Sequence, residues 1–195
     1  MTMRIIAGSA RGRRILSVPK NMKLRPISAR IRQSLFDIIR PRVTASHFLD
    51  LFAGTGAVGL EALSRNAQRV CFVDRDPRCL RVVEKNIERL GFSDRAVAVR
   101  GNVLGALSWI PYRARVKDFD LVFMGPPYRD EDNRPLEYSN TVLTGVAGAK
   151  LLARDGWAIV QHHQNENPGE VKGMERFRQE RYGDSRVTFY RHRRR

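Results

Sequence analysis

The sequence predicts an α/β fold in which a mostly parallel sheet is covered by helices on both faces. Between residues 48 and 162, short apolar runs of strand length alternate with longer amphipathic stretches of helical period. A glycine-rich loop directly follows the first of these runs. Residues 175–192 contain two strand-like runs around Tyr182-Gly183-Asp184-Ser185, which predict a C-terminal antiparallel hairpin.

The first 42 residues predict a small extension before this alternating region. Residues 3–7 and 14–18 are apolar-rich runs on either side of a Gly-Ser-Ala-Arg-Gly loop, so a β-hairpin is expected there. Apolar residues from Ile27 to Ile39 then recur with helical spacing, and Pro41 is expected to close that helix. We therefore expect a basic N-terminal extension over residues 1–42 and a main domain over residues 43–195.

The main domain is expected to follow the alternation in order. Strands are expected at residues 48–52, 69–74, 96–100, 119–124 and 157–162, with helices at 57–66, 77–90, near 103–109 and around 136–152. The hairpin strands are expected at residues 175–181 and 186–192. Strands that alternate with helices are joined by right-handed crossovers, so the first five should pair in parallel.

The chain carries 36 basic and 20 acidic residues, a formal charge of +16, but this charge is concentrated at its two ends. Residues 1–42 hold 11 basic residues and one acid, residues 176–195 hold 8 and 2, and the segment between them holds 17 of each sign. Thirty of the basic residues are arginine, whose planar guanidinium pairs with phosphate and stacks on bases. The distribution favours a protein that binds a polyanion, although a solvated arginine-rich surface would give the same counts.

Composition also argues against several other classes of protein. No run of 18 apolar residues is present, and the first residues lack the apolar core of a signal peptide. The sequence therefore predicts a cytoplasmic protein that does not bind membranes. Its cysteines, Cys71 and Cys79, have neither the spacing of a zinc site nor that of a disulfide framework, so no metal is expected.

The glycine loop, Ala53-Gly54-Thr55-Gly56-Ala57-Val58-Gly59, lies between the first expected strand and the first helix of the main domain. Asp74 follows Gly54 by 20 residues, at the expected end of the second strand, where a carboxylate can accept hydrogen bonds from two ribose hydroxyls. The loop and the acid together predict a nucleoside site. The pattern alone fits either a dinucleotide or S-adenosylmethionine, but Asp50 favours the latter, because a buried anion can help hold an ammonium and would repel a pyrophosphate.

Several residues around this loop are candidates for contact with the cofactor. Asn102, after the third strand, could hydrogen-bond the adenine edge, although turn formation explains Gly101-Asn102 almost as well. The full set of candidate cofactor-binding residues is Asp50, Ala53, Gly54, Thr55, Gly56, Asp74, Arg75 and Asn102.

A second motif, Gly125-Pro126-Pro127-Tyr128, follows the strand expected at residues 119–124. It should therefore lie at the carboxyl edge of the sheet, where open α/β folds bind their ligands. Two prolines fix the local path of the chain and an aromatic ring follows them. Considered alone, the motif is also compatible with a polyproline kink that merely ends a strand.

With these motifs, the sequence resembles the class I, Rossmann-like methyltransferases that modify exocyclic amines. The residues concerned are Asp50 to Gly56, Asp74 and Pro126-Pro127-Tyr128. More narrowly, the chain is similar to the ribosomal small-subunit methyltransferase D (RsmD) family of 16S rRNA guanine-N2 methyltransferases. This similarity is carried by Arg4 to Gly8, Gly12-Arg13, Arg25-Pro26, Arg30 to Phe36 and Tyr182 to Asp184. It spans nearly the whole chain.

The resemblance implies an enzyme that transfers a methyl group from S-adenosylmethionine to the exocyclic N2 of a guanine in 16S rRNA. S-adenosylhomocysteine would be the product, no metal would be needed, and the substrate would be 16S rRNA or the assembling small ribosomal subunit. The enzyme is expected to act as a monomer. Catalytic residues would be Gly125, Pro126, Pro127 and Tyr128.

Gly125 departs from the family pattern, which has Asp or Asn at that position. In the family, that side chain and the carbonyl of the first proline accept the N–H groups of the target amine, while the aromatic ring stacks on the base. Three explanations remain open for this chain. Backbone carbonyls of Gly125 and Pro126 could suffice, a carboxylate from Asp130, Glu131 or Asp132 could replace the missing one, or catalysis could be lost. Asn102 and Gln33 are smaller departures, from Asp and Glu respectively.

The basic N-terminal extension supplies the candidate RNA contacts, because the family's additional motifs fall there. These candidates are Arg4, Arg11, Arg13, Arg14, Arg25, Arg30 and Arg32, and they are expected to bracket the catalytic site. Each could instead be a solvated surface arginine.

Three rival functions follow from the same motifs. A DNA methyltransferase acting on adenine N6 or cytosine N4 would share the glycine loop and the Pro-Pro-Tyr sequence. A catalytically weakened RNA-binding protein would explain Gly125, but not the intact Asp50, Gly54 and Asp74. A nicotinamide oxidoreductase would leave the two basic ends unexplained.

Overall fold

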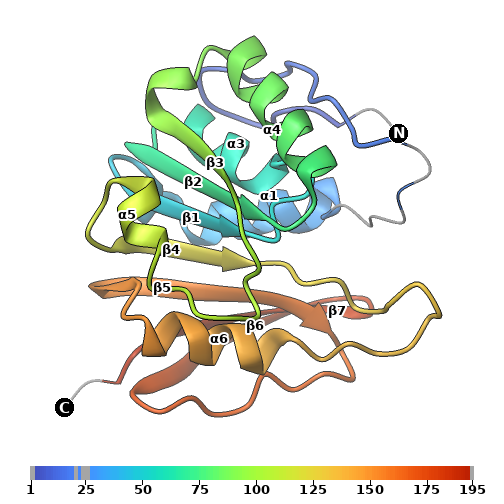
Figure 1. Cartoon of the computed structure of the whole chain (residues 1–195), viewed down its shortest axis with the longest axis vertical. Coiled ribbons are helices and arrows are strands. Elements are labelled where there is room, and N and C mark those ends of the chain that lie inside the picture. Colours follow the sequence, from blue (N-terminus) through green and yellow to red (C-terminus); the bar gives the residue numbers. More distant parts are fainter. Residues whose placement is uncertain (1–2, 20–21, 23–26, 194–195) are drawn as a thin grey trace.

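A computed structural model describes residues 3–19, 22 and 27–193 of the chain. It contains a seven-stranded sheet with the order β3-β2-β1-β4-β5-β7-β6 (Figure 1). The strands are β1 His47–Leu51, β2 Arg69–Asp74, β3 Ala96–Arg100, β4 Phe119–Met124, β5 Leu152–His163, β6 Met174–Tyr182 and β7 Ser185–His192. Strands β1 to β5 pair in parallel, whereas β7 pairs antiparallel with β5 and with β6. The predicted fold class is confirmed.

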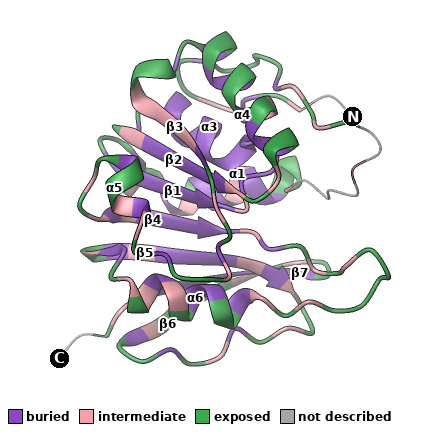
Figure 2. Ribbon diagram, viewed as in Figure 1, coloured by how far each residue is buried: buried purple, intermediate pink, exposed green. Residues whose placement is uncertain are grey.

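Helices cover both faces of the sheet, and strand residues alternate between two apolar clusters. The helices are α1 Ala29–Ile38, α2 Arg40–Val43, α3 Ala57–Ser64, α4 Pro77–Leu90, α5 Ile110–Ala114 and α6 Ser139–Gly148, with a 3-10 turn at Ser93–Arg95. Phe48 and Phe72 point toward α1, α3 and α4, whereas Leu49 and Val73 point toward α5 and α6. In Figure 2 the central strands are accordingly buried, while α4 exposes its outer face.

The predicted elements at residues 69–74, 77–90, 96–100 and 119–124 have the same bounds in the structure. The helix expected near residues 103–109 is wrong, since Asn102 accepts the N–H of Leu104 in a turn and α5 starts at Ile110 with Pro111 in its first turn. Pro41 does not simply close the preceding helix. It lies in the first turn of α2, a position where proline's missing N–H costs nothing.

The N-terminal extension is held by contacts with the main domain as well as by its own short pairing. The expected hairpin is reduced to one bridge, Arg4 with Arg14, and a few flanking hydrogen bonds. The backbone N–H groups of Ile6 and Ala7 donate to the Glu61 carboxylate on α3 instead (2.8 and 2.9 Å). Because the extension and the main domain share one apolar cluster, the boundary at residue 43 stays a prediction. Across the described ranges, no helix is long and apolar enough to span a membrane.

Candidate functional site at the carboxyl edge

Two loops that are far apart in sequence leave the sheet side by side. Leu51 at the end of β1 pairs directly with Met124 at the end of β4. The glycine loop follows the first of these residues, and the Gly-Pro-Pro-Tyr turn follows the second. The N–H of Gly125 points to the Leu51 carbonyl at 3.4 Å, which links the two exits. Both motifs therefore lie at the carboxyl edge, the edge at which the parallel strands end (Figure 1).

The glycines of the loop have different tasks. Gly54 has φ of +55°, and a Cβ there would meet only the Phe52 carbonyl oxygen at 3.9 Å, so the loop is bare on that side. At Gly59 a Cβ would lie 2.2 Å from the Phe72 ring, so glycine is needed for α3 to approach β2. Phe52 itself has φ of +60°, a strained value for a residue with a side chain. Gly54 is itself buried, and no side chain fills the space beside its Cα.

Asp74 fastens this loop to the end of β2. One carboxylate oxygen accepts the N–H of Gly54 at 2.8 Å and the other accepts the N–H of Asp76 at 2.9 Å. Burial raises the pKa of Asp74, and these backbone hydrogen bonds oppose the rise. Each carboxylate oxygen has two lone pairs, so both retain an acceptor position suited to a ribose hydroxyl. The residues present fit an S-adenosyl nucleoside at this edge.

Asp50 has a structural contact that the sequence did not predict. It is 2% exposed and accepts the N–H of Gly59, in the first turn of α3, at 2.9 Å. Burial raises the pKa of Asp50 to about 8, so its carboxyl is mostly protonated at pH 7 in the protein alone. The expected attraction to an ammonium group stays a prediction.

The other candidate cofactor-binding residues also lie in the loops at this edge. Ala53 and Thr55 are buried within the loop, and Arg75 is exposed beyond β2. The side-chain oxygen of Asn102 accepts the N–H of Leu104 at 3.1 Å, which is the turn-forming role considered above. Its amide N–H groups stay available to an adenine edge.

The Gly-Pro-Pro-Tyr turn places Tyr128 against β5 and β7. Its hydroxyl donates to Ser185 Oγ at 3.1 Å and accepts from Gln161 Nε2 at 2.9 Å. Its ring meets that of His163 edge-on, with 5.8 Å between centroids. Apart from their positions at strand ends, nothing in the sequence pointed to these three partners. Together they hold a half-buried aromatic ring in one orientation beside the turn.

The space around Gly125 decides which replacement for the missing carboxylate is feasible. A Cβ on Gly125 would lie 3.1 Å from Phe123 Cε1, so a side chain fits after a small shift of that ring. Asp130 accepts the N–H of Arg134 at 2.8 Å, and Asp132 pairs with the Arg134 guanidinium at 3.0 Å. Both acids are thus engaged within their own loop, which extends beyond the sheet in Figure 1. Replacement of the missing carboxylate by backbone carbonyls or by Glu131 stays a prediction.

Two of the N-terminal arginines, Arg11 and Arg13, do not bracket this site as expected, whereas the roles expected for Arg4, Arg14 and Arg30 stay predictions. The N–H of Ser9 donates to the carbonyl of Ser64 at 2.8 Å, and Arg13 donates to the carbonyls of Arg89 and Leu90. These acceptors end α3 and α4, helices that begin at the carboxyl edge and end at the opposite one. The loop that carries Arg11 therefore lies toward the amino edge of the sheet, the edge at which the parallel strands begin.

The individual arginines also differ in whether their side chains are exposed and able to contact RNA. Arg11, Arg14 and Arg30 are exposed, and Arg4 is exposed but donates to the Gly12 carbonyl at 2.7 Å. Arg25 lies outside the described residues.

The predicted RNA contact of Arg32 is wrong. Its side chain is 1% exposed, donates to the Arg4 carbonyl at 2.5 Å and lies 3.9 Å from the Glu61 carboxylate. Burial lowers the pKa of Arg32 and the Glu61 charge opposes this. A buried carboxylate on the otherwise apolar α3 was the available signal, since such a charge requires a cationic partner.

Comparison with known proteins agrees with this geometry. The family described as conserved hypothetical protein 95 matches residues 3–191. The Bacillus subtilis protein YlbH is 32% identical over 192 residues, 98% of this chain and 100% of that protein. Ribosomal RNA small subunit methyltransferase D of Haemophilus influenzae is 36% identical over 126 residues, 65% of this chain and 64% of that protein. For this relative, the match thus spans slightly less than two thirds of its length.

Solved structures show the same likeness over the whole chain. The Escherichia coli protein yhhF superposes with a TM-score of 0.80 and 25% identity, covering 100% of both chains. A hypothetical protein of Thermus thermophilus superposes with a TM-score of 0.71 and 31% identity, covering 96% of this chain and 98% of that one. The match over residues 3–191, with the glycine loop and the Gly-Pro-Pro-Tyr turn on adjacent strands, shows that the chain belongs to this family, the RsmD family of S-adenosylmethionine-dependent methyltransferases.

Proposed function

We propose that this protein methylates the exocyclic N2 of a guanine in 16S rRNA, as a monomer acting on the RNA or on an assembling small subunit. The observation that carries the proposal is the direct pairing of Leu51 with Met124. It brings a loop suited to the donor nucleoside next to a rigid turn suited to a planar base with an amino group. Relatives named as small-subunit rRNA methyltransferases support the substrate class.

S-adenosylmethionine supplies an activated methyl group when bound, and the residues of the chain orient the two reactants. Asp74 and the backbone of the glycine loop hold the nucleoside of the donor. The carbonyls of Gly125 and Pro126 accept the N–H groups of the guanine amine. Because that nitrogen's lone pair is delocalised into the base, these acceptors favour the tetrahedral geometry that attack requires. The ring of Tyr128 stacks on the base, held by Gln161 and Ser185.

Binding of rRNA without catalysis is the second candidate, and Gly125 favours it. By analogy with oxyanion-hole deletions, the loss of one transition-state hydrogen bond costs on the order of 3 kcal/mol, about a hundredfold in rate. Slow transfer would still be measurable. The two candidates differ in whether a methyl group moves at all.

The deciding experiment measures methyl transfer from labelled S-adenosylmethionine to naked 16S rRNA, to small subunits and to duplex DNA. Mass spectrometry of 16S rRNA from cells with and without the protein then identifies the product. We expect one N2-methylguanosine that depends on the protein. Transfer to duplex DNA alone would support a DNA methyltransferase, and S-adenosylmethionine binding without transfer would support the non-catalytic candidate.

A further inference from the structure

A basic hollow lies at the amino edge of the sheet, opposite the proposed methyl-transfer site. It has a volume of about 860 Å³ and is formed by the starts of β2 and β3, by α5 and by the segment that leads into β4. We call it the amino-edge hollow. The charged and aromatic residues that line it are Arg69, Tyr112, Arg113, Arg115 and Lys117. Among the residues that the structure describes, no Asp or Glu lines it. The charge of this lining is therefore of one sign.

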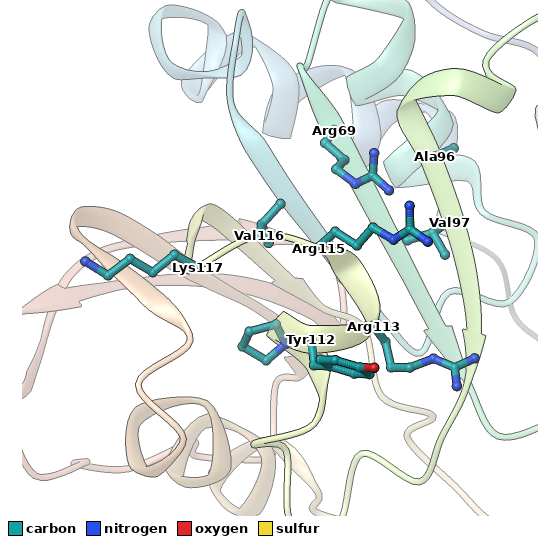
Figure 3. A pocket seen from close by; sticks show the side chains of 9 residues that line it. Arg69, Ala96, Val97, Tyr112, Arg113, Arg115, Val116 and Lys117 are labelled. Carbon is teal, nitrogen blue, oxygen red and sulfur yellow. The ribbon is translucent and has the colours of Figure 1, made fainter.

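The positive charges of the hollow are not paired with acids. Within the described part of the chain, none of its four cations forms an ion pair with a carboxylate. Arg69 is fixed by a hydrogen bond from Nε to the Ala114 carbonyl at 2.7 Å. In Figure 3 the side chains of Arg69, Arg113 and Arg115 extend toward the same side, whereas Lys117 extends away from them. Three guanidinium groups thus face one region.

This concentration is a product of folding, because the segment from residue 43 to 175 carries 17 charges of each sign. An uncompensated cluster of guanidinium groups in a concave surface attracts anions, and the planar groups suit phosphate oxygens in particular. The volume far exceeds that of one phosphate. A chain of linked phosphates fits the size and the charge better than a single small anion does.

An exposed aromatic ring stands beside these cations. Tyr112, on α5, is 85% exposed and is the single large apolar residue that stays so exposed among those the structure describes. Pro111 precedes it in the first turn of the helix and limits the backbone there. An aromatic ring next to arginines can stack on an unpaired base while the arginines hold its phosphates. This combination favours RNA over a purely ionic ligand.

We propose that the amino-edge hollow binds the backbone and one unstacked base of the same rRNA molecule, at a segment remote from the methylated guanine. The inference rests on the proposed function. A parallel strand of five or six residues is about 17–20 Å long, so the two sites are separated by roughly that distance. An oligonucleotide just large enough to present the target guanine does not reach the hollow, whereas a folded rRNA domain does.

The test compares Arg113→Gln/Arg115→Gln with a control of equal net charge, Lys85→Gln/Lys172→Gln, on exposed sites outside the hollow. We expect the hollow variant to bind a folded 16S rRNA domain about tenfold more weakly at about 0.1 M salt. Its log-log salt slope should be shallower by about 1.5, as two phosphate contacts are lost. Binding of a short target oligonucleotide and of S-adenosylmethionine should not change. The control should lose less than threefold on either RNA.

Tyr112→Ala and Tyr112→Phe separate stacking from charge. The first should weaken binding of the folded domain about fivefold and the second should not, since the ring is retained. Equal losses on the short and long RNA, or equal losses in the hollow variant and the control, would overturn the inference. Failure of the proposed function looks different: the unmodified protein would transfer no methyl group, while its binding of the two RNAs could still be compared.

Discussion

The two edges of the sheet are built from different kinds of residue. The carboxyl edge presents glycines, prolines and the carboxylates of Asp50 and Asp74, whose pKa values are both raised by burial. The amino edge presents the cations of the hollow, which form no ion pair with a carboxylate among the described residues. At the first edge the backbone and buried groups fix positions, which is what a reaction needs. At the second edge exposed side chains supply charge, which is what affinity for a polyanion needs. Substitutions at the two edges should therefore affect different measurements.

The largest effect is expected for Asp50→Asn at the carboxyl edge. Folding keeps a proton on Asp50 up to about pH 8, whereas the unfolded chain loses it near pH 4. The free energy of unfolding therefore falls as pH rises between these values. Asparagine can still accept the Gly59 N–H but cannot ionise. Between about pH 4 and pH 8 the free energy of unfolding of the variant should rise relative to that of the original protein by on the order of 5 kcal/mol, measured by urea unfolding. Parallel pH profiles would contradict the burial argument.

Asp74→Ala should weaken S-adenosylmethionine binding about 100-fold, or about 2.7 kcal/mol, in calorimetry. Two hydrogen bonds to a charged acceptor are lost. The control is Asp76→Ala, which removes the neighbouring carboxylate that caps α4 at the Arg78 N–H. This control should cost about 1 kcal/mol of stability and leave the affinity unchanged. Equal affinities of the two variants for S-adenosylmethionine would show that the methyl donor does not bind at the end of β2.

Gly125→Asp should raise turnover at least about tenfold by restoring a side-chain acceptor for the amine. Gly125→Ala is the matched control, because it brings the same Cβ contact with Phe123 without an acceptor. Steady-state methyl transfer to rRNA measures both. If neither variant gains, the amine does not lie at this turn.

The smallest effect concerns Arg11 and Arg13, neighbours that the structure uses differently. Arg11→Gln should weaken binding of a folded rRNA domain about threefold and leave thermal stability unchanged. Arg13→Gln should instead lower stability by about 0.5–1 kcal/mol, because Arg13 donates to the carbonyls that end α4. Filter binding and thermal unfolding distinguish the two. The same outcome for both would show that position along the chain, rather than contact, governs their roles.

Local patterns were sufficient for most of the fold and for the position of the site. Alternating apolar runs predicted the parallel strands, and α4 was predicted from Pro77 to Leu90 with no error in its bounds. The glycine loop and the Gly-Pro-Pro-Tyr turn both follow strands, and parallel strands end at one edge. The short α5 was missed because a five-residue helix has too little periodicity to recognise.

The partners of functional side chains were beyond such patterns. Tyr128 is held by Gln161 and Ser185, which lie 33 and 57 positions away in the chain. From the sequence, Arg32 was interpreted as a surface cation. In the structure its side chain is buried next to Glu61 of α3. Whether an arginine is buried, capping a helix or exposed depends on which residues pack beside it, and hydrophobic spacing does not report that.

The sequence by itself determined the α/β alternation, the nucleoside loop with its acid, and the turn at the end of β4. These follow from spacing and from the chirality of parallel crossovers, which are properties of neighbouring residues. Tertiary structure alone decided where free positive charge lies. Net charge is a sum over the chain, but the field at a surface depends on which charges are paired or buried. For that reason a segment with no net charge contains a uniformly basic hollow.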